Sequence, residues 1–145
     1  MENPVIKSLE KNPLVKEITS QSDHIGNLQP MEEALLLAAA FDVDKKSRII
    51  VKKNRYEALQ LHARLSPLVE DTVLLTTEES LRVQSLAASP ADRQEMISGL
   101  AALRSDKPKL IITNTAAFSR CLPQRTVFEE NCFTLKTGEE ISIEK

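Results

Sequence analysis

The sequence predicts an α/β fold with three layers and a mostly parallel sheet. Short apolar runs typical of strands alternate along the chain with longer stretches of helical periodicity, and this order builds a parallel sheet with right-handed crossovers. The 145 residues are 41% hydrophobic and 28% charged, which is the size and balance of one domain with its own core. Internal repeats and low-complexity segments are absent from the sequence.

Residues 1–22 are predicted to form a helical extension before the main domain. Asn3-Pro4 and Asn12-Pro13 each put a capping residue directly before a proline, which suits the first position of a helix. The apolar residues behind them are Val5, Ile6 and Leu9 in the first helix, and Leu14, Val15 and Ile18 in the second. Residues 23–27 are then expected to form a short strand or a turn.

A buried helix is predicted to begin at Gln29-Pro30. Pro30 suits the first helical position, and Glu32 and Glu33 suit the electropositive first turn. Residues 34–41 are apolar on every side, so this helix should be deeply buried, and residues 42–46 should form a polar loop.

The remaining elements continue the alternation. The apolar centre of the run 48–52 predicts a strand covered on both faces, and Asn54 with Glu57 forms a capping box that starts the next helix. Further strands are predicted at residues 72–76, 109–113 and 132–136. Further helices are predicted after Ser89-Pro90 (with a stripe of Met96, Ile97, Leu100 and Leu103), at 116–122 and around 126–130, while 77–88 is ambiguous.

The loop before the buried helix has the spacing of a phosphate-binding loop with inverted chemistry. When G-x-x-x-x-G-K-[ST] is laid from Gly26, Met31 stands at the second glycine, Glu32 at the lysine and Glu33 at the hydroxyl residue. Pro30 also removes one backbone N–H. Two carboxylates repel a phosphate, so we expect no nucleotide here. The simpler interpretation is that Glu32 and Glu33 complement the helix dipole.

A basic cluster surrounds the strand 48–52 and is the candidate nucleic-acid patch. Its members are Lys45, Lys46, Arg48, Lys52, Lys53 and Arg55. Because the strand separates its two lysine pairs by about 20 Å at 3.3 Å per residue, a solvated rim is the favoured interpretation.

The other reactive side chains favour structural roles. Cys121 and Cys132 are expected to be small core fillers in a reduced compartment, and His24 and His62 are too isolated to bind a metal or act as a pair. Ser89 is explained as a helix cap. Asp42 and Asp44 make only a weak case for a cation, so no catalytic residue and no metal site is predicted.

Composition excludes several classes of function. A net charge of −2 lacks the basic excess of nucleic-acid-binding domains, and three glycines, no tryptophan, one tyrosine and four phenylalanines leave little for phosphate loops or base stacking. The sequence shows no signal peptide and no apolar run near the roughly 20 residues that cross a bilayer, so we expect a cytoplasmic protein without membrane contact.

The order of several segments resembles the N-terminal, UvrB-like region of bacterial transcription-repair coupling factors. The resemblance covers about residues 23–141. It rests on the order and spacing of residues 48–59, 73–81, 88–93, 111–117, 122–123 and 133–141.

This resemblance implies a non-catalytic module that helps recruit UvrA to RNA polymerase stalled at DNA damage. The first domain of UvrB resembles a P-loop NTPase, and Gly26 to Glu33 fits a version that has lost its nucleotide site. The family's motor, an ATP-driven DNA translocase that needs ATP and magnesium, lies further along the chain, so this part is expected to hold no cofactor. UvrB's aromatic DNA-inserting hairpin is expected to be missing, since no aromatic residue lies between Tyr56 and Phe118.

The predicted organisation is therefore a helical extension at 1–22, a degenerate P-loop-like α/β domain at 23–136 and the start of a connection to a next domain at 137–145. The expected partners are the rest of the coupling factor and, through it, UvrA and RNA polymerase. The alternatives are a helicase-type half-domain that still uses ATP and a stand-alone nucleic-acid-binding module that uses the basic cluster.

Overall fold

Three parallel strands and seven helices form the parts of the chain that can be described. The computed structural model describes residues 3–20, 25–78, 90–120, 122–132 and 138. The strands are β1 (Arg48–Lys52), β2 (Thr72–Leu75) and β3 (Leu110–Asn114). The helices are α1 (Pro4–Leu9), α2 (Pro13–Thr19), α3 (Pro30–Asp44), α4 (Arg55–Leu65), α5 (Pro90–Ala102), α6 (Thr115–Phe118) and α7 (Arg125–Glu130).

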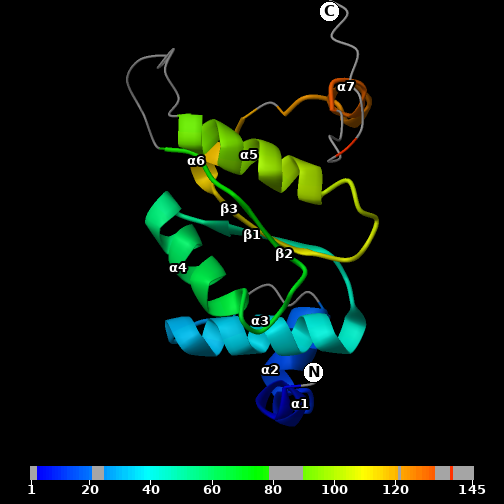
Figure 1. Cartoon of the computed structure of the whole chain (residues 1–145). Helices are drawn as coiled ribbons and strands as arrows, with labels where there is room; N and C mark the ends of the chain where they lie inside the picture. Colours follow the sequence, from blue (N-terminus) through cyan, green and yellow to red (C-terminus); the bar gives the residue numbers. More distant parts are fainter. Residues whose placement is uncertain (1–2, 21–24, 79–89, 121, 133–137, 139–145) are drawn as a thin grey trace, which may run out of the picture.

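The sheet has the strand order β1-β3-β2, and both pairings are parallel. The chain passes from β1 over β3 to β2 and then returns to β3, so right-handed crossovers place α4 and α5 on opposite faces. Figure 1 shows this arrangement, with α3 and α4 on one side of the sheet and α5 and α6 on the other. The three-layer α/β fold predicted from the sequence is thus confirmed.

The main core lies between the sheet and the layer of α3 and α4. Leu110 and Ile112 of β3 are fully buried there beside Leu61 and Leu65 of α4. Helices α1 and α2 pack on α3 and add Ile6 and Val15 to the same core. The apolar character of α3 on every side follows from this position, because helices pack on more than one of its faces.

The capping signals in the sequence placed the helix starts well. The side chains of Asn3 and Asn12 accept the backbone N–H of Val5 and Leu14 at 3.0 and 2.9 Å. Asn54 accepts the N–H of Glu57 at 2.8 Å, as the predicted capping box requires.

The prediction of a loop at 42–46 is wrong for residues 42–44, which belong to helix α3. Helix α3 continues to Asp44, and it ends because Lys45 adopts a left-handed conformation with φ 50° while its N–H still bonds to the carbonyl of Phe41 at 2.9 Å. Residues 25–29 form neither a strand nor a hydrogen-bonded turn, and Asn27 adopts a left-handed conformation with φ 60°. Residues 23 and 24 lie outside the described residues.

The prediction that β1 is covered on both faces is also wrong. Ile49 and Val51 are 59% and 41% exposed, because β1 is an edge strand and α5 packs over β2 instead. The central strand is β3, which begins one residue later than predicted.

Helices α5 and α6 also depart from prediction. In α5, Ile97 is exposed, while Gly99 is buried against β2. A Cβ on Gly99 would lie 2.8 Å from the carbonyl oxygen of Leu74 and still closer to the side chain of Leu75, so the helix approaches the strand where no side chain intervenes. Helix α6 ends at Phe118 rather than Leu122.

Most of the predicted connection at 137–145 and most of the strand at 132–136 lie outside the described residues. So do His24, Ser89, Cys121 and most of the ambiguous segment 77–88. None of the helices in the described parts of the chain combines the length and the hydropathy that a bilayer-spanning segment needs.

Candidate functional site

The carboxyl ends of the three strands form the edge where parallel α/β sheets bind ligands. Here β1 ends at Lys52, β2 at Leu75 and β3 at Asn114, and the parallel register places these ends next to one another. The N-terminus of α3 lies at the same edge, because Glu33 contacts Lys52. The loop singled out in the sequence is therefore in the position where a ligand would bind.

Glu32 completes the cap of α3 from within the protein. Its carboxylate Oε2 accepts the backbone N–H of Gln29 at 2.8 Å, and Pro30 at the first helical position has no N–H to offer. Met31 beside them is largely exposed. A carboxylate already engaged with the helix start leaves an unfavourable place for a phosphate.

Glu33 forms an ion pair with the last residue of β1. Lys52 Nζ lies 2.9 Å from each carboxylate oxygen of Glu33, and both side chains are mostly buried. The charge of Lys52 is thus neutralised by a carboxylate of the protein itself. A phosphate would have to displace that carboxylate and then face it as a like charge.

A cavity of about 360 Å³ lies beside this pair, between the start of α3 and α4. Its lining mixes charges and apolar surface: Leu28, Pro30, Glu33, Lys52, Tyr56, Glu57, Gln60, Leu61 and Arg64. Two acids and two bases face the cavity, so it has no excess charge for an anion or a cation.

Polar contacts also connect α4 with α5 at this edge of the sheet. Arg55 at the start of α4 pairs with Glu95 of α5 at 3.2 Å and with Glu78 at 3.4 Å. Thr76, directly after β2, donates its hydroxyl hydrogen to Glu95 at 3.3 Å. These contacts join the start of α4, the middle of α5 and the end of β2.

Asn114 forms the third link, and sequence reasoning missed it. This fully buried side chain accepts the backbone N–H of Thr77 at 3.2 Å and donates to the Thr77 carbonyl at 2.9 Å. The amide thereby holds the segment that follows β2 against the end of β3. The available signal was an asparagine directly after an apolar strand run, where a polar side chain must find partners.

The basic cluster does not form one patch. Lys45 pairs with Asp42, while Arg48 binds both carboxylate oxygens of Asp44 at 2.6 and 2.9 Å. The hydrogen bonds from Arg48 hold the pKa of Asp44 below its usual value against the effect of burial. Arg48 and Asp44 are thus committed to each other.

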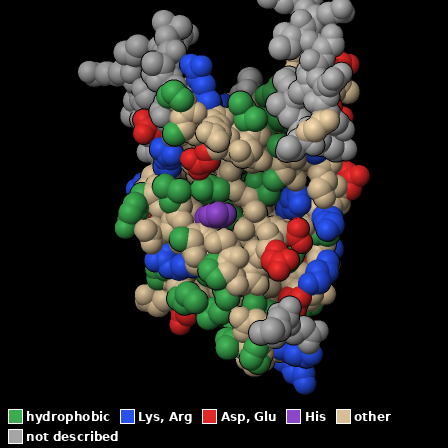
Figure 2. Space-filling view, in the orientation of Figure 1, with side chains coloured by type: hydrophobic (Ala, Val, Ile, Leu, Met, Phe, Trp, Pro, Cys, Tyr) green, Lys and Arg blue, Asp and Glu red, His purple; other side chains and the backbone are tan. Residues whose placement is uncertain are grey.

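Lys52 and Arg55 are paired with acids as described above, while Lys46 and Lys53 are exposed. Figure 2 shows one face of the molecule, on which Lys and Arg side chains are dispersed and interspersed with acidic ones. The cluster therefore offers a nucleic acid few side chains that are not already engaged by carboxylates.

The surroundings of His62 and Cys132 agree with structural roles for both side chains. His62 is half-buried on α4, and burial lowers its pKa while the charge of Glu95 raises it by less. Cys132 is a free, half-buried thiol rather than a fully buried core residue. Within the described residues, no group of three potential ligands could hold a metal ion.

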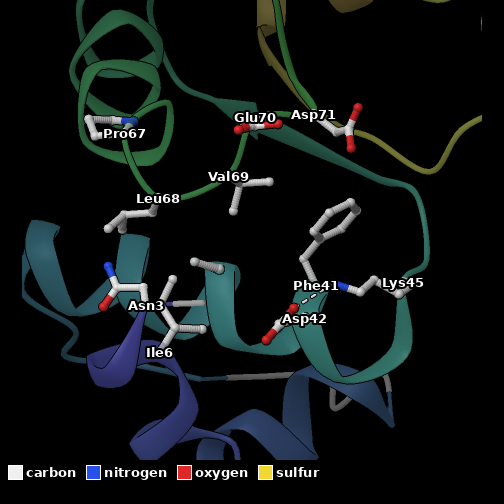
Figure 3. A pocket seen from close by; sticks show the side chains of 11 residues that line it. Asn3, Ile6, Phe41, Asp42, Lys45, Pro67, Leu68, Val69, Glu70 and Asp71 are labelled. Carbon is white, nitrogen blue, oxygen red and sulfur yellow. Dashed lines mark hydrogen bonds and ion pairs between the residues drawn. The ribbon is translucent and has the colours of Figure 1, made fainter. Parts of the chain in front are cut away.

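The opposite, amino edge of the sheet carries another cavity of about 360 Å³, shown in Figure 3. Three carboxylates from Asp42, Glu70 and Asp71 line it, and the single lysine, Lys45, already pairs with Asp42. The excess of negative charge disfavours a nucleotide or phosphate there.

Comparison with known proteins gives a distant similarity to transcription-repair coupling factors. Two such proteins, from two strains of Staphylococcus epidermidis, are each 22% identical to this chain over 122 residues. The alignment covers 83% of this chain but 10% of each relative, so the chain spans about a tenth of the length of the curated relatives it matches. No family model matches the sequence, and no solved structure matches it.

This similarity supports a distant relation to transcription-repair coupling factors. It agrees in extent with the resemblance seen in the sequence, which also runs over nearly the whole chain.

Proposed function

We propose that this chain is the N-terminal domain of a transcription-repair coupling factor and works without nucleotide as part of its UvrB-like module. In this role it helps to recruit UvrA to RNA polymerase stalled at DNA damage. The proposal is supported by the match to coupling factors over 122 residues, which cover 10% of those proteins and leave ample length for a motor elsewhere.

The contact between Glu33 and Lys52 carries the non-catalytic part of the proposal. A working phosphate loop has a lysine where this chain has Glu32. The lysine that does lie at this edge, Lys52 of β1, has its Nζ 2.9 Å from both carboxylate oxygens of Glu33. The neighbouring Glu32 is engaged in the helix cap. Both acidic side chains therefore have structural partners that explain their presence.

Calorimetric titration of the 145-residue protein with magnesium-ATP tests this part. We expect no saturable heat at millimolar nucleotide, and a micromolar Kd would contradict the proposal. In the double variant Glu32→Lys with Glu33→Thr, gain of nucleotide binding would mean that the charges alone prevent it. Continued absence of binding would mean that the loop geometry is unsuitable as well.

UvrA capture tests the recruitment part. We expect immobilised UvrA from the same organism to capture the full-length gene product. It should capture less of a version that lacks residues 1–145. Equal capture by both versions would refute a contribution of this domain. The length of the gene should be determined first. The aligned 122 residues are 10% of each relative, so the relatives have more than about 1,000 residues, and we expect a gene product of similar length.

The nucleic-acid-binding alternative finds less support in the contacts, since four of its six basic residues pair with acids. A gel shift at low salt distinguishes the two. Binding with a steep salt dependence that is lost in Lys46→Glu with Lys53→Glu would favour the alternative.

A further inference from the structure

The cavity between the start of α3 and α4 is lined by polar side chains that differ in how far they are engaged. Its volume of about 360 Å³ lies within the range of sites that bind small ligands or parts of peptides. The two helices that form it lie on the same side of the sheet (Figure 1). Its charges balance in number, so its preference for a ligand depends on which of them already have partners.

Both acids and the lysine in the lining have partners within the protein. Glu33 and Lys52 form the ion pair described above. Glu57 accepts a hydrogen bond from the side-chain amide of Asn54 at 3.2 Å. It also lies in the first turn of α4, where the helix dipole stabilises a negative charge. These three side chains therefore have structural roles that need no ligand.

Tyr56, Gln60 and Arg64 form a second group along α4. They follow one another at intervals of four residues, so they lie on one face of the helix over about 12 Å at 1.5 Å per residue. Tyr56 is exposed, while Gln60 and Arg64 are half-buried. In the part of the chain that the structure describes, none of these three side chains has a hydrogen bond or an ion pair. Arg64 thus brings to the cavity a charge that is not yet engaged.

Apolar surface lines the same cavity. Leu61 of α4 is buried, Leu28 before α3 is half-buried, and Pro30 at the start of α3 is exposed. Together with the ring of Tyr56 they give the cavity an apolar part beside the guanidinium of Arg64. Aromatic rings and guanidinium groups are the side chains that are enriched at protein–protein contacts.

We propose that this cavity binds an acidic segment of a partner polypeptide. The carboxylate of a glutamate or aspartate in that segment pairs with Arg64 and accepts a hydrogen bond from the Gln60 amide. A nearby apolar side chain of the segment packs against Leu28 and Pro30. A guanidinium can form two parallel hydrogen bonds with one carboxylate, which makes this pairing selective. The inference goes beyond the proposed function and does not depend on it, because the contacts of the cavity alone carry it.

Other ligands fit the cavity less well. A phosphate group carries close to two negative charges, so Glu33 and Glu57 repel it more strongly than they repel a single carboxylate. A small organic acid pairs with Arg64 but leaves the rest of the helix face uncovered. An extended segment of about four residues, at 3.3 Å per residue, spans the face as far as Tyr56. Charge and length therefore favour a polypeptide.

NMR titration of the isotope-labelled 145-residue protein tests the proposal. The probe is the capped peptide acetyl-Leu-Ala-Glu-Ala-Leu-amide, and the matched peptide has glutamine in place of glutamate. We expect saturable shifts of the backbone amides of Tyr56, Gln60 and Arg64 with the glutamate peptide. Binding of the glutamine peptide should be at least about 10-fold weaker, because the charge-assisted pair is lost. Equal affinity for the two peptides, or no saturation up to about 10 mM glutamate peptide, would overturn the proposal.

Two variants and a control locate the binding. Arg64→Gln should weaken the glutamate peptide at least about 10-fold, and Tyr56→Ala should weaken it by a smaller factor. The matched control Arg120→Gln changes an exposed arginine outside the cavity and should leave the affinity unchanged. Urea unfolding of Arg64→Gln should give the wild-type midpoint, which separates a lost contact from a lost fold. Unchanged affinity in Arg64→Gln would contradict the assignment of the carboxylate to this side chain.

Three further titrations distinguish other occupants. Acetate that shifts the same amides with the affinity of the glutamate peptide would overturn the proposal in favour of a small organic acid. Tighter binding of inorganic phosphate than of the peptide would overturn it in favour of an anion site. Shifts that grow with protein concentration in the absence of peptide would overturn it in favour of a second copy of the chain. Each of these results leaves the proposed function standing.

Discussion

Replacing Asn114 with alanine should remove the link that holds the segment after β2 against the end of β3. The variant loses two hydrogen bonds, at 3.2 and 2.9 Å, and leaves both backbone groups of the buried Thr77 without a partner. A buried polar group left unsatisfied costs about 1–3 kcal/mol. Two such groups give about 2–6 kcal/mol, and we expect about 3–4 kcal/mol because the segment after Leu75 can relax toward water.

Urea unfolding of the 145-residue protein measures this loss. With a slope of about 2 kcal/mol/M, the midpoint should fall by about 1.5–2 M with little change in the slope. Asn131→Ala is the matched control, because the exposed Asn131 makes a single hydrogen bond to the Val127 carbonyl at 2.8 Å. Its effect should stay below about 0.5 kcal/mol. Equal midpoints for the two variants would refute the argument, since Thr77 would then find other partners without cost.

Three further variants test packing and charge. Gly99→Ala should destabilise the protein by about 1–2 kcal/mol in urea unfolding, because crowding against β2 exceeds the gain of about 1 kcal/mol in helix propensity. Asp44→Asn should cost about 1–3 kcal/mol at pH 7, and this difference from wild type should vanish in acid, as the pH falls through the lowered pKa of Asp44 and its bonds to Arg48 are lost. His62→Gln should reduce the loss of stability between pH 7 and pH 5, because the folded protein, with the pKa of His62 lowered, resists a proton that the unfolded chain accepts near pH 6.5.

The sequence predicted local structure well where a local signal fixes it. The starts of α1 and α2 follow from an asparagine before a proline, and both asparagines cap their helices as expected. The start of α4 follows equally from Asn54 and Glu57. Each of these signals acts within four residues, so the rest of the fold does not alter it.

Strand order could not be predicted in this way. The runs 48–52 and 109–113 have nearly the same pattern of a basic residue and three apolar ones, but one lies at the edge of the sheet and the other at its centre. Which strand is central depends on pairing between distant segments. The exposure of Ile49 and Val51 is therefore a property of the tertiary fold that their own sequence does not contain.

The start of α3 lies at the carboxyl edge, where the sequence analysis places its loop, while its contacts were only partly foreseen. The acidic pair Glu32 and Glu33 was singled out from the phosphate-loop spacing, but the partner of Glu33 lies 19 residues along the chain. Asn114 and its partner Thr77 are 37 residues apart. Contacts of that range follow only once the parallel register has aligned the strand ends.

The two kinds of edge in this sheet behave in opposite ways, and this contrast bears on how the domain works. At the carboxyl ends, polar side chains that would hold a ligand in an enzyme are engaged with one another: Glu33 with Lys52, Arg55 with Glu95, and Asn114 with Thr77. Along β1, by contrast, backbone groups and two aliphatic side chains have no partner in the described part of the chain. The carboxyl edge therefore serves to hold the domain together, because its polar side chains bind one another.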